Sequence, residues 1–150
     1  MATLVWLQII VGQCFIYLSI TINEAFEIHQ IGLYLSGVTI AGAIGYWILA
    51  TVKTKESDIK LDKFHGLAYD YELKSILFLV CCLGILGFPF TPTFLGIDLI
   101  FNHIQANQIA LIVFVSISFV LVEIAALRLY ARLFLGPNKR NDHPIAFRSS

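Results

Sequence analysis

Residues 84–98 have the sequence Gly-Ile-Leu-Gly-Phe-Pro-Phe-Thr-Pro-Thr-Phe-Leu-Gly-Ile-Asp, at the centre of the apolar run Ser75–Phe101. The run is long enough to cross a bilayer. It cannot form one regular helix, because each proline lacks a backbone donor and clashes with the preceding turn. The sequence therefore predicts a membrane helix that is interrupted near Gly87–Pro92. The residues expected at the break are Gly87, Pro89, Thr91, Pro92 and Gly96.

A break inside hydrocarbon needs polar partners, because each freed backbone group costs several kcal/mol unless protein, hydroxyls or water satisfy it. The hydroxyls of Thr91 and Thr93 are expected to satisfy some of the freed carbonyls. An interrupted membrane helix usually lines a polar cavity, and a carboxylate, Asp98, follows this one. The pattern therefore favours an ion or substrate path over a simple membrane anchor.

The composition indicates an integral membrane protein. Hydrophobic residues make up 58% of the 150-residue chain and charged residues only 13%, too few for the polar surface of a soluble domain. The net charge of zero gives no support for binding nucleic acid.

The three cysteines lie in apolar runs without zinc or haem spacing, so we expect no metal and no cofactor. No nucleotide loop or nucleophile–base pair indicates an enzyme, so the chain is not expected to be one on its own.

Four apolar segments reach the length of a membrane span, which predicts an all-α integral membrane protein with four transmembrane helices, the third interrupted. These segments are Ala2–Ile22, Ile31–Val52, Ser75–Phe101 and Ile109–Leu135. They define a transmembrane four-helix unit over residues 1–137, with a polar loop over residues 53–74 and a short tail over residues 138–150. A bundle this small has little interior, so a functional path would need helices from other chains.

The basic residues predict the orientation. All ten Lys and Arg residues lie in the long loop or toward and beyond the end of the fourth span, and the two opposite connections contain none. By the positive-inside rule, both termini and the 53–74 loop are expected to be cytoplasmic.

Three ionisable residues are candidates for a proton or ion path. Asp98 follows the break and is a possible proton acceptor; the alternative is a hydrated carboxylate near the outer interface, or a cap of the second half-helix. Glu123 lies in the middle of the fourth span, where a carboxyl rarely faces lipid; a structural interhelical hydrogen bond is its alternative role. Arg128 is about 140° around the helix from Glu123, so the partner of Glu123 is expected on another helix or subunit. Arg128 lies deeper than Arg132 and is a candidate to pair with a carboxylate. Arg132 is expected to reach the headgroups.

The stretch Gly87–Asp98 resembles the broken helix of the antiporter-like proton-conducting membrane subunits. This family occurs in respiratory complex I, Mrp-type cation/proton antiporters, membrane-bound hydrogenases and two-component inorganic-carbon uptake systems. The segment Arg128–Pro137, with its arginines, aromatics and glycine, resembles the helix that follows in the family. The resemblance covers Gly37–Pro137, is strongest over Leu83–Pro137, and corresponds to the C-terminal portion of a family member.

The resemblance implies a partial antiporter-like subunit that contributes to proton or cation translocation in a larger complex. Other membrane subunits would supply the missing helices, and the chain would be a multi-pass protein of the plasma (inner) membrane. The family usually has Lys or Glu where this sequence has Ile97, so Asp98 would have to substitute for that group. A structural or assembly subunit, a fragment without transport activity, and a small homo-oligomeric transporter are the alternatives.

Overall fold

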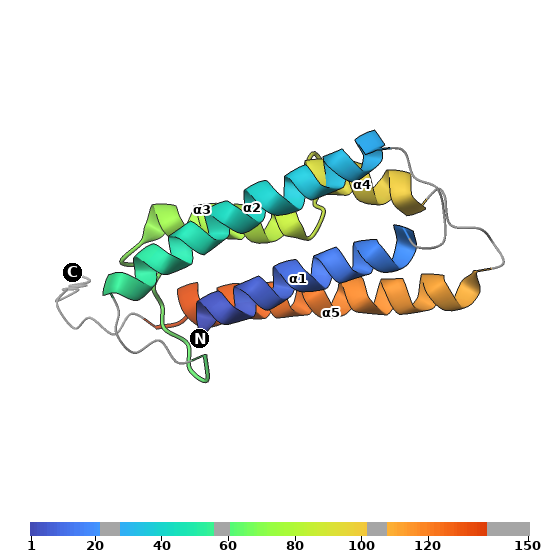
Figure 1. The fold of residues 1–150 in the computed structure, drawn as a ribbon. Helices are drawn as coiled ribbons and strands as arrows, with labels where there is room; N and C mark the ends of the chain where they lie inside the picture. The colour runs from blue at the N-terminus through green and yellow to red at the C-terminus, as the bar shows by residue number, and fades with distance from the viewer. Residues whose placement is uncertain (22–27, 56–60, 102–107, 138–150) are drawn as a thin grey trace, which may run out of the picture.

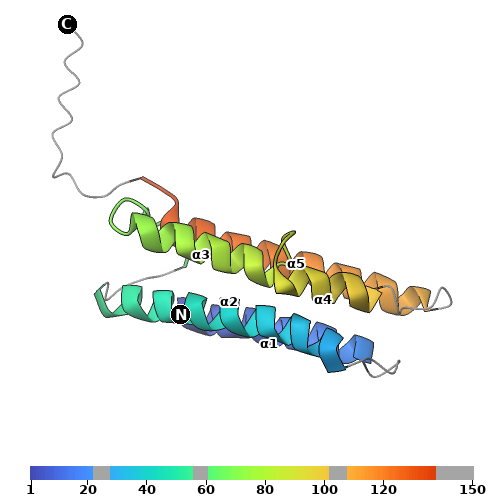
Figure 2. The same ribbon diagram turned by 90° about the horizontal axis from the view of Figure 1, so that it is seen from above.

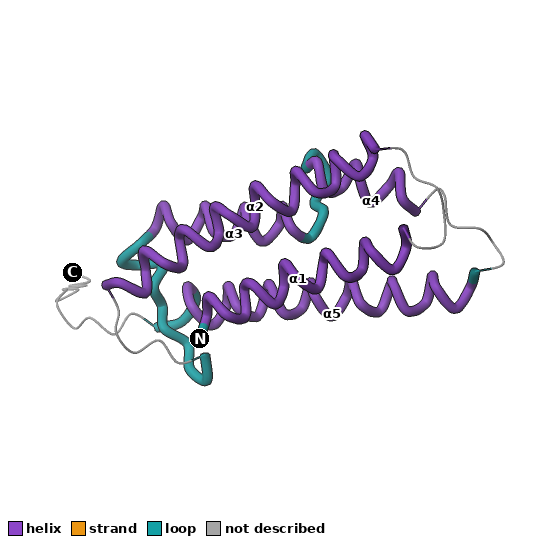
Figure 3. Tube along the Cα trace, in the orientation of Figure 1, coloured by secondary structure: helices purple, strands orange, loops and turns teal. Residues whose placement is uncertain are grey.

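The computed structural model describes residues 1–21, 28–55, 61–101 and 108–137, and their regular structure is entirely helical (Figures 1 and 3). Its helices are α1 (Ala2–Thr21), α2 (Ile28–Lys55), α3 (Glu72–Ile85), α4 (Pro92–Phe101) and α5 (Ile109–Phe134). The third apolar run is thus divided between α3 and α4. The predicted tail over residues 138–150 and residues 56–60 of the predicted loop lie outside the described residues.

The helices form a bundle of two layers. Figure 2 shows α1 and α2 in one layer and α3, α4 and α5 in the other. The helix α1 packs between α2 and α5, and α2 runs along both α3 and α4. The start of α1 and the end of α5 lie at the same end of the bundle as the end of α2 and the start of α3 (Figure 1). Neighbouring helices along the chain are therefore antiparallel, except for α3 and α4, which continue in one direction.

The core is built around aromatic rings and close helix contacts. Trp6 is fully buried, and its indole Nε1 donates a hydrogen bond of 2.9 Å to the carbonyl of Gly42 on α2. A side chain at Gly45 would overlap the Trp6 ring, so glycine allows α1 and α2 to approach closely here. The Phe78 ring packs 4.8 Å from that of Trp6 and 5.4 Å from that of Phe134, which links α1, α3 and α5.

The outer surface of the bundle is apolar. Large hydrophobic side chains such as Phe15, Phe114 and Leu121 are more than half exposed, which suits contact with hydrocarbon rather than water. Two helical stretches, the 24-residue Ile31–Thr54 and the 26-residue Ile109–Phe134, are long and apolar enough to cross a membrane. Four complete single-helix spans are not confirmed. The break is one physical reason, because α3 and α4 have 14 and 10 residues and extend only about 21 and 15 Å.

Candidate functional site

The chain between α3 and α4 turns through local backbone and side-chain hydrogen bonds. Gly87 has φ +69°, and the amide of the next residue, Phe88, donates a 3.0 Å bond back to the carbonyl of Leu83. This is the longer bond of a Schellman motif, which ends a helix at a left-handed glycine. A side chain at Gly87 would lie 2.6 Å from Cδ1 of Ile97, so the turn also packs against α4.

The second half-helix begins with an N-cap. The Thr91 hydroxyl donates to the carbonyl of Phe88 at 2.7 Å and accepts from the amide of Phe94 at 3.2 Å. Pro92 is the first residue of α4, where its missing amide hydrogen costs nothing. The expected role of the Thr91 hydroxyl is confirmed. Gly96, by contrast, lies inside α4 rather than at the break. A side chain there would come within 2.6 Å of Cβ of Tyr34, so glycine lets α4 approach α2 closely.

A buried amide caps the end of α3. Gln13 of α1 is fully buried, and its Nε2 donates a 3.2 Å hydrogen bond to the carbonyl of Ile85, the last residue of α3. The Tyr34 hydroxyl on α2 donates to Gln13 Oε1 at 2.7 Å and to the Gln13 main-chain carbonyl at 3.1 Å. Three helices are therefore joined through one glutamine at the level where the third apolar run is interrupted.

Two further buried hydroxyls, one beside Tyr34 and one beside Gly37 of α2, have no hydrogen-bond partner among the described residues. The Tyr17 ring stacks on that of Tyr34 with centroids 5.0 Å apart, and its hydroxyl is unpaired. The Thr93 hydroxyl on α4 is also unpaired, which differs from the expectation that it satisfies a carbonyl. Ile97, at the position that carries an ionisable residue in the resembled family, packs against the same apolar cluster as Tyr17 and Tyr34. We call Gln13, Tyr17, Tyr34 and Thr93 the polar centre.

The three ionisable candidates lie at different depths. Glu123 precedes Ala126 by three residues on α5. On α3, Cys82 contacts the Ala126 carbonyl through its thiol at 3.9 Å. Because α3 and α5 are antiparallel, Glu123 is level with Ile85 and the end of α3. Its side chain is half-buried.

Asp98 lies toward the end of the bundle where α2 begins. Gly96 faces Tyr34, and the next residues of α4 run antiparallel to the first turns of α2. Gly84, near the break, instead faces Ala41, which lies seven residues after Tyr34 on α2. Asp98, two residues beyond Gly96, is therefore about 14 Å from the level of Gly84, measured along the bundle. Its side chain is exposed.

The third candidate, Arg128, is exposed five residues beyond Glu123 on α5. Within the described part of the chain, no hydrogen bond or ion pair joins any two of these three side chains.

The loop before α3 caps the end of α5. The amides of His65, Gly66, Leu67 and Ala68 donate to the carbonyls of Arg132, Leu135, Leu133 and Phe134, at 3.0 to 3.2 Å. The Arg132 guanidinium also donates to the Asp62 carbonyl at 2.7 Å and lies 4.6 Å from the centroid of the Phe64 ring. The carbonyls at the end of this helix, which lack partners within it, are therefore satisfied by protein.

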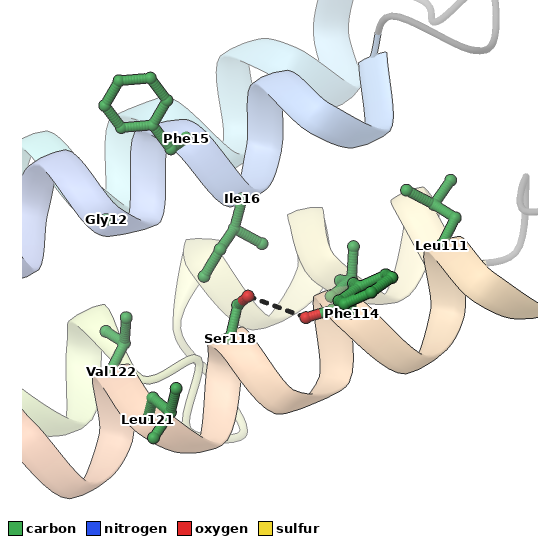
Figure 4. A pocket seen from close by; sticks show the side chains of 9 residues that line it. Gly12, Phe15, Ile16, Leu111, Phe114, Ser118, Leu121 and Val122 are labelled. Carbon is green, nitrogen blue, oxygen red and sulfur yellow. Dashed lines mark hydrogen bonds between the residues drawn. The ribbon is translucent and has the colours of Figure 1, made fainter.

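A hollow of about 550 Å³ lies between α1 and α5 (Figure 4). Its lining is apolar apart from the Ser118 hydroxyl, and that hydroxyl donates to the carbonyl of Phe114 at 2.8 Å. Gly12 and Val122 form part of its wall. With its one polar group already paired, this hollow presents no chemistry for an ion. Among the described residues, no group of three His, Cys, Asp or Glu side chains is placed to hold a metal.

Gln13, Tyr17 and Tyr34 are not among the site residues predicted from the sequence. One signal was available: Gln13 is an amide in the middle of an apolar segment, and such a group must find a partner inside the protein. The tyrosines gave no comparable signal, because their rings pack like other apolar groups. Only the three-dimensional structure links the Tyr34 hydroxyl through Gln13 to the break and stacks the Tyr17 ring on Tyr34.

A family model described as NADH:quinone oxidoreductase/Mrp antiporter, TM, matches residues 11–122. The match includes the break and the whole polar centre. It begins well before Gly37, where the resemblance seen in the sequence starts, and it ends before the Arg128–Pro137 segment. No match is found among curated proteins or among solved structures.

Proposed function

Because the chain belongs to the membrane-subunit family of NADH:quinone oxidoreductases and Mrp antiporters, we propose that it contributes to proton or cation translocation within a larger membrane complex. In this proposal it is a partial antiporter-like subunit. The observation that carries the proposal is the interruption between Ile85 and Pro92, at which the buried amide of Gln13 caps the first half-helix.

The polar centre supports a route for ions at this level. A buried amide and three tyrosine or threonine hydroxyls are costly in an apolar bundle, and two of those hydroxyls have no partner among the described residues. Unpaired hydroxyls can both donate and accept, as a proton relay requires. We therefore place the inner part of the route beside Tyr34 and Ile97.

The charged candidates would extend this route along surfaces that other chains or bound lipid headgroups cover. Arg128, Glu123 and Asp98 follow one another in depth along the bundle, and Asp98 and Arg128 are exposed on its apolar outside. A charged group inside a membrane seldom faces lipid. Other membrane subunits are therefore the proposed partners, alongside the lipid bilayer.

The orientation in this proposal has both termini on the cytoplasmic side of the plasma membrane. The described basic residues of the loop and of α5 lie at the end of the bundle where α1 begins and α5 ends, as the positive-inside rule requires. A cysteine introduced at Lys63 should resist a membrane-impermeant reagent in intact cells. Labelling there, with none of a cysteine at His29, would reverse the orientation.

The proposal is tested by proton flux through the assembled complex in sealed vesicles. Asp98→Asn keeps the shape of the side chain and removes its charge, so flux should fall well beyond any loss of assembly. Ile97→Glu in that background places a carboxyl beside Tyr34 and should restore part of the flux. Glu72→Gln, at an exposed residue in the first turn of α3, is the matched control and should leave flux unchanged.

Other outcomes select other functions. If Asp98→Asn leaves flux unchanged in a fully assembled complex, the relay role of Asp98 fails and a structural or assembly subunit is preferred. If the purified chain alone transports protons or cations in liposomes, it is a small homo-oligomeric transporter rather than a partial subunit.

A further inference from the structure

A hollow between α1 and α5 has two arginines in its wall. It measures about 260 Å³, and its other walls are apolar: Val5 of α1, Leu61 of the loop, and Ala125 and Leu129 of α5. Arg128 and Arg132 are four residues apart, which places both on one face of α5 about 6 Å apart along its axis. The hollow therefore combines two fixed positive charges with an apolar floor.

The two arginines retain donors for a ligand. Arg132 is held in place by its hydrogen bond to the Asp62 carbonyl and by the Phe64 ring, but these contacts leave other N–H groups of its guanidinium available. No hydrogen bond among the described residues engages the Arg128 guanidinium, whose side chain is exposed. Both charges are thus available to an anion that enters the hollow.

The hollow continues along the helices as a groove whose lining is apolar apart from Gln8 of α1. A second hollow of about 210 Å³ shares Val5 and Ala125 with the first and reaches Leu121 and Val122. From Arg132 to Val122 the helix rises about 15 Å, which is half the thickness of a hydrocarbon core. The wide hollow of Figure 4 begins at Leu121 and Val122, where this groove ends.

We propose that this groove binds one anionic phospholipid from the leaflet at the Arg132 end. Its phosphate lies between the guanidinium groups of Arg128 and Arg132, and an acyl chain follows the groove to Val122. Guanidinium groups bind phosphate oxygens through paired, charge-assisted hydrogen bonds, and basic pockets between membrane helices suit lipid headgroups. An extended acyl chain can lie along hollows of about 260 and 210 Å³, and the two arginines at their outer end match the charge of an anionic headgroup.

The test counts lipids that stay bound to the purified full chain by native mass spectrometry. Phosphatidylglycerol should be retained at one per chain, and phosphatidylcholine with the same acyl chains should not. Arg128→Gln and Arg132→Gln should each weaken retention about fivefold or more. Lys53→Gln, at an exposed basic residue near the same end of the bundle, should have no effect.

A second pair of variants separates a built groove from general attraction to positive charge. Ala125→Phe fills the position shared by the two hollows and keeps both arginines, so it should also abolish retention. Ala43→Phe, at an exposed residue of α2, should not. Because Arg128→Gln leaves the packing of Ala125 intact, it keeps the test valid if Ala125→Phe fails to fold.

Each remaining outcome overturns the proposal. Equal retention of phosphatidylcholine would indicate unspecific lipid contact. Displacement of phosphatidylglycerol by free inorganic phosphate would indicate an anion site without a role for the acyl chain. Retention of phosphatidylglycerol that survives Arg128→Gln and Arg132→Gln would show that these arginines do not bind the headgroup. If a co-purified membrane subunit blocks the lipid, the groove is a docking surface for a helix. None of these measurements depends on transport.

Discussion

Replacing Gln13 with leucine is expected to lower the free energy of unfolding by about 1–3 kcal/mol. The substitution keeps a side chain of similar size but removes the Nε2 donor that caps the Ile85 carbonyl. That carbonyl lies at the end of a half-helix and has no helical partner of its own, so it is left buried and unsatisfied. The Tyr34 hydroxyl loses the Gln13 side-chain acceptor but keeps the main-chain carbonyl of residue 13. Its contribution to the loss of stability is therefore smaller than that of the Ile85 carbonyl.

The measurement is reversible unfolding in mixed micelles, followed by circular dichroism as the fraction of denaturing detergent is raised. Gln8→Leu is the matched control, because Gln8 is an exposed glutamine on the same helix. A double-mutant cycle with Tyr34→Phe should give a coupling energy of about 0.6 kcal/mol between the side chains of Gln13 and Tyr34, the average for interhelical hydrogen bonds in membranes. If Gln13→Leu is no more destabilising than Gln8→Leu, the capping argument is wrong.

Two further predictions concern the second half-helix. Gly37→Ala should destabilise the bundle by about 1–3 kcal/mol, because the added methyl overlaps Thr93 and pushes α4 from α2. Gly32→Ala, with open space around it, should be nearly neutral. Equal melting temperatures for the two variants would contradict this packing. Thr91→Ala should cost about 1 kcal/mol through loss of the bond from the Phe94 amide, and Thr91→Ser should retain most of that stability in the same melting assay.

The sequence was sufficient to predict the interruption of the third apolar run, because proline acts locally. Pro92 cannot continue a helix from Ile85, and the Thr-Pro pair at residues 91–92 is a typical helix start. The sequence also predicted helix in each of the four long apolar runs, the third of which forms both α3 and α4. The number of complete spans was not determined in this way, because length and composition do not show how far each half-helix reaches.

The polar centre could not be predicted from the sequence, because it depends on the register between helices. Gln13, Tyr34 and Ile85 come from three segments, and only their packing brings an amide, a hydroxyl and a free carbonyl together. Formal charge within apolar segments points to Asp98 and Glu123 instead. Their surroundings are set by which face of each helix is covered, which a single sequence does not specify.

The cap on α5 has a consequence for the order of assembly during synthesis. The four amides at residues 65–68 are made long before the carbonyls at residues 132–135 that accept their hydrogen bonds. The loop therefore cannot reach its final backbone pairing until the last helix is in place. Until then only α1 and α2 can hold α3 in place, so release of a chain that stops before α5 would leave the loop without its backbone partners.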